Sequence, residues 1–264
     1  MNGKIITIIN QKGGVGKTTT ALNLSAGLAE NFRDTLLIDL DGQANTTQGL
    51  GLTSENLELS VYDILMNNSH VEDVIKNTEV DLLDLMPAHP DLNGAKIELV
   101  EVKNREYRLK KALKNLKKSY DFIIIDSPPS LDLLTINALT ASDSALITIQ
   151  CEYYALEGLG RLVDTLYRIK RGLNPTLEIE GVLMTMHDKR TNLSRQVMDE
   201  IKKHFKDAVY RTVIPRNVRL AEAPSFGETI YQYAPNSTGT KAYKKLTQEF
   251  LEDNGYIINN VLPD

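Results

Sequence analysis

The sequence predicts an α/β fold, with a doubly wound and mainly parallel sheet that carries helices on both faces. Short β-branched runs alternate with segments of helical length along the chain. Runs such as Phe122–Ile125 are apolar at every position, which is typical of strands buried on both faces and therefore of a parallel sheet. The runs predicted as strands are Ile5–Ile9, Thr35–Ile38, Val80–Met86, Phe122–Ile125, Ala145–Ile149, Ile179–Met184 and Val209–Val213.

Three of the segments outside these runs carry apolar side chains at helical spacing. Thr20–Glu30 follows the first strand, Arg105–Lys118 precedes the fourth, and Thr240–Glu252 lies near the end of the chain. No internal repeat, low-complexity tract or Gly/Ser-rich linker divides the sequence. We therefore predict one domain over residues 1–253, followed by a tail over residues 254–264 that we expect to be frayed.

The composition excludes several classes of protein. With 42% hydrophobic and 25% charged residues, the 264-residue chain has globular values that exclude a disordered or fibrous protein. Cys151 is the only cysteine, which excludes a disulfide framework and a CxxC site within one chain. No stretch approaches the roughly 18 apolar residues of a membrane span, and the N-terminus lacks the pattern of a signal peptide. We expect a soluble, cytoplasmic protein.

A glycine-rich loop over residues 12–19 joins the first strand to the first helix, and it predicts a phosphate-binding site. Glycines allow successive backbone N–H groups to converge on one point, where the helix N-terminus adds positive potential. Lys17 is placed to neutralise the β- and γ-phosphates, and Thr18 to offer a hydroxyl to Mg²⁺. The loop residues predicted to bind a nucleoside triphosphate are Lys12, Gly13, Gly14, Val15, Gly16, Lys17, Thr18 and Thr19.

Acidic residues follow two other predicted strands. Asp126 comes directly after Phe122–Ile125, at the carboxyl end of a buried strand, where open α/β sheets bind ligands and where a carboxylate can hold a magnesium-bound water. Asp39 and Asp41 follow the second strand on alternate positions, so one of them can lie at the metal and the other near an attacking water. The histidines have no paired metal spacing, and we expect no metal other than magnesium.

These motifs resemble a known family. The loop KGGVGKTT, the segment Asp39-Leu40-Asp41 and the segment Ile125–Pro129 are similar to those of the deviant Walker-A ATPases. Two further segments, Arg190–Asn192 and Ile214–Pro224, resemble the ParA/Soj ATPases that partition chromosomes and plasmids. The resemblance runs from about residue 3 to residue 253, so the predicted domain is a P-loop ATPase domain with ATP and Mg²⁺ as its cofactors.

The resemblance implies roles for individual residues. Lys12 matches the signature lysine that crosses the interface of an ATP-bound homodimer to the partner's nucleotide, and Gly13 lies at that interface. Asp41 matches the acid that orients the hydrolytic water, and Asp126 matches the Walker-B acid. Catalysis is then assigned to Lys12, Lys17 and Asp41, magnesium binding to Thr18, Asp41 and Asp126, and contacts with the adenine to Pro215 and Asn217. Gly42 departs from the family, which usually has proline there, so we expect a more mobile loop.

Positive charge is concentrated near the end of the chain. Residues 189–219 hold nine basic and three acidic residues, although the whole chain has a net charge of −5. The resemblance assigns non-specific double-stranded DNA binding to Arg190 and Arg219, with Lys189, Arg195 and Arg216 as neighbours. It further implies that ATP dimerises the protein, that the dimer coats DNA at the nucleoid, and that hydrolysis stimulated by a ParB/Spo0J-like centromere-binding partner releases it.

Three alternatives are weighed against this interpretation. A MinD-like membrane-recruited ATPase would need a basic amphipathic C-terminal helix, whereas the sequence ends in a segment with little positive charge. An iron–sulfur carrier would need more than one cysteine in each chain. An ATP-dependent regulator of transcription or replication initiation stays open, although operator-specific binding is not expected because the first strand begins close to Lys4.

Overall fold

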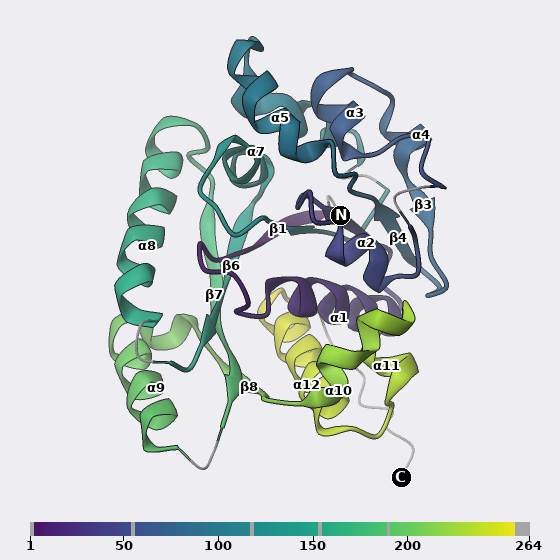
Figure 1. Ribbon diagram of the computed structural model, residues 1–264. Helices are drawn as coiled ribbons and strands as arrows, with labels where there is room; N and C mark the ends of the chain where they lie inside the picture. The colour runs from purple at the N-terminus through teal and green to yellow at the C-terminus, as the bar shows by residue number, and fades with distance from the viewer. Residues whose placement is uncertain (1–2, 54–55, 117–118, 153–154, 189–190, 257–264) are drawn as a thin grey trace.

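The computed structural model describes residues 3–53, 56–116, 119–152, 155–188 and 191–256, and its centre is a twisted sheet (Figure 1). Within these residues the sheet has eight strands in the order β3-β4-β2-β5-β1-β6-β7-β8. Every neighbouring pair is parallel except β3 and β4. The strands are β1 Lys4–Ile9, β2 Thr35–Asp39, β3 Lys76–Asn77, β4 Leu83–Met86, β5 Phe122–Asp126, β6 Ser144–Gln150, β7 Glu178–His187 and β8 Val209–Pro215.

Helices cover both faces of the sheet, as the continuous apolar strands predict. The helices are α1 Lys17–Glu30, α2 Asn45–Gly49, α3 Val61–Met66, α4 Val71–Val74, α5 Leu92–Glu98, α6 Arg108–Leu113, α7 Leu133–Ala141, α8 Ala155–Gly172, α9 Asn192–Phe205, α10 Val218–Glu222, α11 Ile230–Tyr233 and α12 Thr238–Asp253. Side chains of α1, α11 and α12 form one core with one face of the strands, whereas those of α3, α5 to α7, α8 and α9 pack on the other face (Figure 1). The prediction of a doubly wound α/β fold is confirmed.

The parallel strands place the functional segments together. The carboxyl ends of parallel strands lie at one edge of a sheet, so the loops after β1, β2, β5, β7 and β8 meet there. In register, Asp39 at the end of β2 lies directly beside Asp126 at the end of β5. The acidic residues that the sequence places after separate strands are therefore neighbours.

The predicted strand Val80–Met86 is partly wrong, since β4 begins only at Leu83. Leu82 has a φ of 62°, in the left-handed region, and the backbone turns there instead of extending. The Thr78 hydroxyl stabilises the turn by donating to the carbonyl of Leu83 (2.7 Å). This turn joins β4 to the short antiparallel strand β3, which the sequence pattern does not predict because β3 has only two residues.

The predicted helix Arg105–Lys118 is shorter in the structure. A 3-10 turn occupies Arg105–Tyr107, α6 begins at Arg108, and residues 117–118 lie outside the described residues. The cause is Asn137 of α7, whose side-chain amide donates to the Arg105 carbonyl (2.7 Å) and accepts from the Leu109 N–H (3.2 Å). These two backbone groups would bond each other in a continuous α-helix. A side chain from α7 therefore interrupts the helix.

The beginning of the predicted frayed tail is packed. Asn254 accepts a hydrogen bond from the Lys4 ammonium (2.6 Å) and donates to Glu180 (2.8 Å). The ring of Tyr256 lies 5.3 Å from that of Phe122. Residues 257–264 lie outside the described residues. No helix among the described residues has the length and apolar character needed to cross a membrane.

Candidate nucleotide and magnesium site

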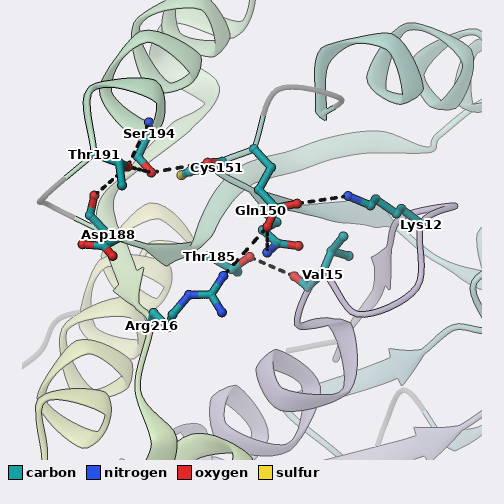
Figure 2. A network of polar contacts seen from close by, with 10 residues as sticks. Lys12, Val15, Gln150, Cys151, Thr185, Asp188, Thr191, Ser194 and Arg216 are labelled. Carbon is teal, nitrogen blue, oxygen red and sulfur yellow. Dashed lines mark hydrogen bonds and ion pairs between the residues drawn. The ribbon is translucent and has the colours of Figure 1, made fainter.

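The loop between β1 and α1 has the backbone of a phosphate cradle. Gly14 and Gly16 have φ values of 72° and 84°, which side-chain-bearing residues adopt only with strain. Gly16 is the N-cap of the 14-residue helix α1. The hydroxyl of Thr185, near the end of β7, donates to the Val15 carbonyl at 2.8 Å and fixes the loop from the side (Figure 2). The helix N-terminus and the loop amides therefore lie at the carboxyl edge of the sheet.

Lys17 is buried inside this loop, with a residue exposure of 7%. Its ammonium donates to the Lys12 carbonyl at 3.2 Å. Burial lowers the pKa of Lys17, while the nearby carboxylates of Asp126 and Asp41 act in the opposite direction. A charged group that has lost much of its hydration gains strongly from a polyphosphate ligand, because the anion replaces water as its partner.

Asp126 provides a suitable position for magnesium. Its Oδ2 accepts hydrogen bonds from the hydroxyls of Thr18 (2.8 Å) and Thr46 (2.7 Å). Its Oδ1 is buried and has no hydrogen-bond partner within the described chain. A buried carboxylate oxygen without a partner is costly unless a cation or its water satisfies it. Burial raises the pKa of Asp126 to about 6, and the two threonine hydroxyls oppose that rise. The donor set of hydroxyl and carboxylate fits Mg²⁺.

The structure separates the roles of Asp39 and Asp41. Both carboxylate oxygens of Asp39 are engaged by the chain, Oδ2 by the backbone N–H and hydroxyl of Thr47 (2.9 and 2.8 Å) and Oδ1 by the Asp41 N–H (3.1 Å). Burial, followed by the charge of Asp126, raises the pKa of Asp39 to about 7. Asp41 is partly exposed and close enough to Lys17 to influence it. Asp39 therefore shapes the loop, and Asp41 is the acid available to a ligand.

Sequence reasoning missed two threonines that organise these acids. Thr46 and Thr47 are fully buried at the start of α2, and they donate to Asp126 and Asp39 respectively. Thr47 also accepts the N–H of Ala88, in the loop after β4 (2.9 Å). No local pattern marks them, since Thr47 lies 8 positions after Asp39 and Thr46 lies 80 positions before Asp126.

Lys12 and Gly13 lie on the exposed rim of the loop. The Lys12 ammonium pairs with Glu152, after β6, at 3.4 Å, and its side chain extends away from the loop interior (Figure 2). A β-carbon added at Gly13 would meet only Pro129, at 3.9 Å, so this chain alone leaves room for a side chain. At Gly42 the added β-carbon would lie 2.7 Å from Asn93. The glycine that replaces the usual proline is thus packed under a side chain from α5.

A cleft of about 370 Å³ lies beside the loop. Pro215 and Asn217, predicted to contact the adenine, both line it, between the end of β8 and α10. The Asn217 side chain is already engaged, because its Oδ1 accepts the Arg219 N–H (2.8 Å) and its amide donates to Thr238 (2.8 Å). The other residues that line the cleft are Gly16, Thr19, Thr185, Met186, Ile214, Arg216, Val218, Leu220, Ala221 and Tyr243.

Three of the five basic residues predicted to bind DNA are described, and all three are exposed. Arg195 lies on α9, and Arg216 follows β8, with its guanidinium 3.8 Å from Glu152. Arg219 lies on α10 and pairs with Glu222 at 2.9 Å. Lys189 and Arg190 lie outside the described residues.

The single cysteine of the sequence lies buried directly after β6. Cys151 is 3% exposed, and burial raises the pKa of its thiol to about 11. No group of three or more His, Cys, Asp or Glu side chains suited to a metal ion occurs among the residues that the structure describes.

Comparisons with known proteins place this site within a described family. A family model described as an AAA domain matches residues 3–179. The sporulation initiation inhibitor protein Soj of Bacillus subtilis (strain 168) is 58% identical over 247 residues, which cover 94% of this chain and 98% of that protein. This chain belongs to the ParA/Soj family of partition ATPases. The chromosome partitioning protein ParA of Myxococcus xanthus (strain DK1622) is 51% identical over 250 residues, which cover 95% of this chain and 88% of that protein.

The chain is also similar to a solved structure that holds a nucleotide. Cobyrinic acid a,c-diamide synthase from Mycobacterium smegmatis, crystallised with an ATP analogue and magnesium, gives a TM-score of 0.84 at 34% identity and covers 96% of each chain. Family membership confirms the predictions of a P-loop fold, of an ATPase and of ATP with Mg²⁺ as cofactors.

Proposed function

We propose that the chain is a DNA-partition ATPase in which ATP brings two copies together, the dimer binds DNA non-specifically, and hydrolysis releases it. One observation supports this proposal above the others. The loop carries two lysines with opposite surroundings, because Lys17 is buried within its own loop whereas Lys12 is exposed at the rim. A second lysine that does not enter its own loop is suited to the nucleotide of a partner subunit.

Within one subunit, the loop amides and Lys17 bind and neutralise the phosphates. Thr18 and Asp126 hold the magnesium, which supplies electrostatic stabilisation of the developing charge when it is bound. Asp41 accepts a hydrogen bond from the attacking water and orients it, which is a role that a partly exposed carboxylate near Lys17 can fill. The cleft lined by Pro215 and Asn217 receives the base.

Two subunits would meet across the rim that carries Lys12 and Gly13. The open space at Gly13 lets a partner's backbone approach closely, and a side chain there would keep the subunits apart. Lys12 must leave Glu152 to reach the partner's nucleotide. That pair joins two half-exposed side chains at 3.4 Å, so its rupture costs little.

The same carboxyl edge carries the basic side chains proposed to bind DNA. Arg216 and Arg219 flank the base cleft, so nucleotide and DNA occupy neighbouring surfaces. Non-specific affinity rises with the number of phosphates neutralised, and a dimer doubles the contacts of a monomer. We place the protein on the nucleoid, with a ParB/Spo0J-like protein as the partner that stimulates hydrolysis.

The MinD-like alternative would need a membrane-binding C-terminal helix. Among the described residues, the apolar side chains of α12 are buried in the core, with Tyr243, Leu246 and Phe250 each at most 1% exposed, so α12 itself has no apolar face free for a membrane. The regulator alternative has one observation in its favour, since the Bacillus subtilis relative is named a sporulation initiation inhibitor. Partition and regulation both require ATP-gated DNA binding, so the first test addresses that step.

The test measures oligomeric state and DNA retention at fixed salt with ATP, ADP or no nucleotide. We expect a dimer and DNA binding with a non-hydrolysable ATP analogue, and a weakly binding monomer with ADP. In Gly13→Val, nucleotide binding should persist while both dimer and DNA binding are lost. DNA retention that is equal in ATP and ADP, or a wild-type monomer with the analogue, would contradict the proposal.

A further inference from the structure

Thr46 connects two parts of the site that lie far apart in the sequence. It is the second residue of α2, the short helix that follows Asp41, and its side chain is fully buried. Its hydroxyl donates to Oδ2 of Asp126 at 2.7 Å. The segment that carries the water-orienting acid is therefore tied to the carboxylate proposed to hold magnesium.

The hydrogen bonds of Asp126 are strongly asymmetric. Thr18 and Thr46 both donate to Oδ2, while Oδ1 is buried without a partner in the described chain. The terminal torsion of an aspartate is soft, so an unrestrained carboxylate rotates readily. Two donors on one oxygen hold the other oxygen in a single direction. Thr18 is itself assigned to the metal, so Thr46 is the donor left to orient the carboxylate.

The segment around Thr46 is anchored on both sides. The adjacent Thr47 binds Asp39 and the N–H of Ala88, which fixes the start of α2 to β2 and to the loop after β4. Asp39 in turn accepts the N–H of Asp41 (3.1 Å). A shift of Asp126 would therefore be transmitted through Thr46 to the backbone that positions Asp41.

We propose that Thr46 is a positioning residue that orients Asp126 for magnesium and couples magnesium binding to the placement of Asp41. The inference rests on the magnesium and water-orienting roles proposed above for Asp126 and Asp41, and not on the DNA cycle. Its failure would leave ATP-gated DNA binding untouched, and the loss of that gating would leave the role of Thr46 intact.

The experiment compares Thr46→Val, which keeps the shape and removes the donor, with Thr46→Ser, which keeps the donor. Affinity for a fluorescent ATP analogue is measured in EDTA and across free Mg²⁺ from micromolar to millimolar, and kcat and KM are measured at saturating Mg²⁺. For Thr46→Val we expect unchanged affinity in EDTA, a roughly tenfold higher Mg²⁺ requirement and a kcat lowered about tenfold or more with little change in KM. Thr46→Ser should keep the wild-type Mg²⁺ requirement and kcat.

Thr140→Val is the matched control. Thr140 is a fully buried threonine on α7 whose hydroxyl has no hydrogen-bond partner within the described chain, so its replacement tests the loss of a buried hydroxyl alone. An unchanged Mg²⁺ requirement in Thr46→Val would overturn the proposal. So would equal weakening with and without Mg²⁺, or a serine variant as impaired as the valine variant. Should Thr46→Val not fold, Thr46→Ala against Thr46→Ser provides the same contrast.

Discussion

The half of the site proposed to bind phosphate and magnesium differs from the half proposed to bind base and DNA in burial and in the partners of its side chains. In the first half Lys17, Asp39 and Asp126 are buried and held by the loop carbonyl and the threonine hydroxyls. In the second half, Arg216 and Arg219 are exposed and pair with glutamates of the same chain. The first half is already held in place by its own chain, whereas the arginines of the second half would have to leave their glutamates to bind DNA as proposed.

The largest expected effect concerns the buried half. Asp126→Asn should reduce ATP turnover by roughly a hundredfold or more, because the neutral amide cannot hold the magnesium. The same change should stabilise the nucleotide-free protein by about 1–3 kcal/mol, because burial raises the pKa of Asp126 and its charge is therefore costly at neutral pH. Both quantities follow from steady-state kinetics and thermal denaturation.

Asp132→Asn is the matched control for stability. Asp132 caps α7 and pairs with Lys96 at 3.0 Å, and its pKa is lowered even though burial acts in the opposite direction, because hydrogen bonds and Lys96 favour the charged form. The asparagine should therefore destabilise the protein. If both variants changed the free energy of unfolding in the same direction, burial of Asp126 would not be the reason that its charge is costly.

Changes to the exposed arginines should alter the affinity for DNA and leave the rate of ATP turnover unchanged. Arg219→Ala should weaken ATP-dependent DNA binding roughly tenfold. The salt slope should fall by about 0.9 for each phosphate that is no longer neutralised, so by roughly 2 in a dimer. Fluorescence anisotropy over a salt series measures both. Lys114, an exposed lysine after α6, provides the control Lys114→Ala, which should leave the slope unchanged. An unaltered salt slope in Arg219→Ala would show that Arg219 does not contact the DNA phosphates.

A smaller effect is expected when the Mg²⁺ requirement for nucleotide binding is measured as a function of pH, which again tests the buried carboxylates. Raised pKa values of about 7 for Asp39 and about 6 for Asp126 mean that both gain protons as the pH falls from about 8 to about 6. A protonated Asp126 attracts Mg²⁺ less, so the free Mg²⁺ needed for half-maximal nucleotide binding should rise several-fold over that range. Nucleotide affinity in EDTA serves as the reference. A Mg²⁺ requirement that does not change between these pH values would contradict the raised pKa of Asp126.

The smallest effect is expected at Glu152, which joins the two halves by pairing with Lys12 and Arg216. Glu152→Gln should release Lys12 and strengthen ATP-dependent dimerisation by up to about fivefold, since exposed pairs contribute only ~0.2–1 kcal/mol. Analytical ultracentrifugation measures the change. Glu178→Gln breaks an exposed pair with Lys170 (3.7 Å) elsewhere and should have no effect. Weaker dimerisation in Glu152→Gln would show that this carboxylate supports the interface.

Features that depend on local sequence could be predicted, whereas features that depend on long-range contacts could not. The loop over residues 12–19 and Asp126 were predictable, because local spacing and strand ends determine where their side chains lie. Thr46 and the Asn137 amide were not, because each acts on a partner 80 or 28–32 positions away that only the folded chain brings close. The engaged amide of Asn217 was likewise hidden, since its partner Thr238 belongs to another helix.

The hydrogen bond between Lys4 and Asn254 has a practical consequence. It joins the start of β1 to the end of α12 at the amino edge of the sheet, opposite the edge where the nucleotide loop begins. A probe attached near either residue should therefore report on the protein without obstructing ligand or subunit contacts. A circular permutant that links these two points and opens a surface loop elsewhere should retain the ATPase core.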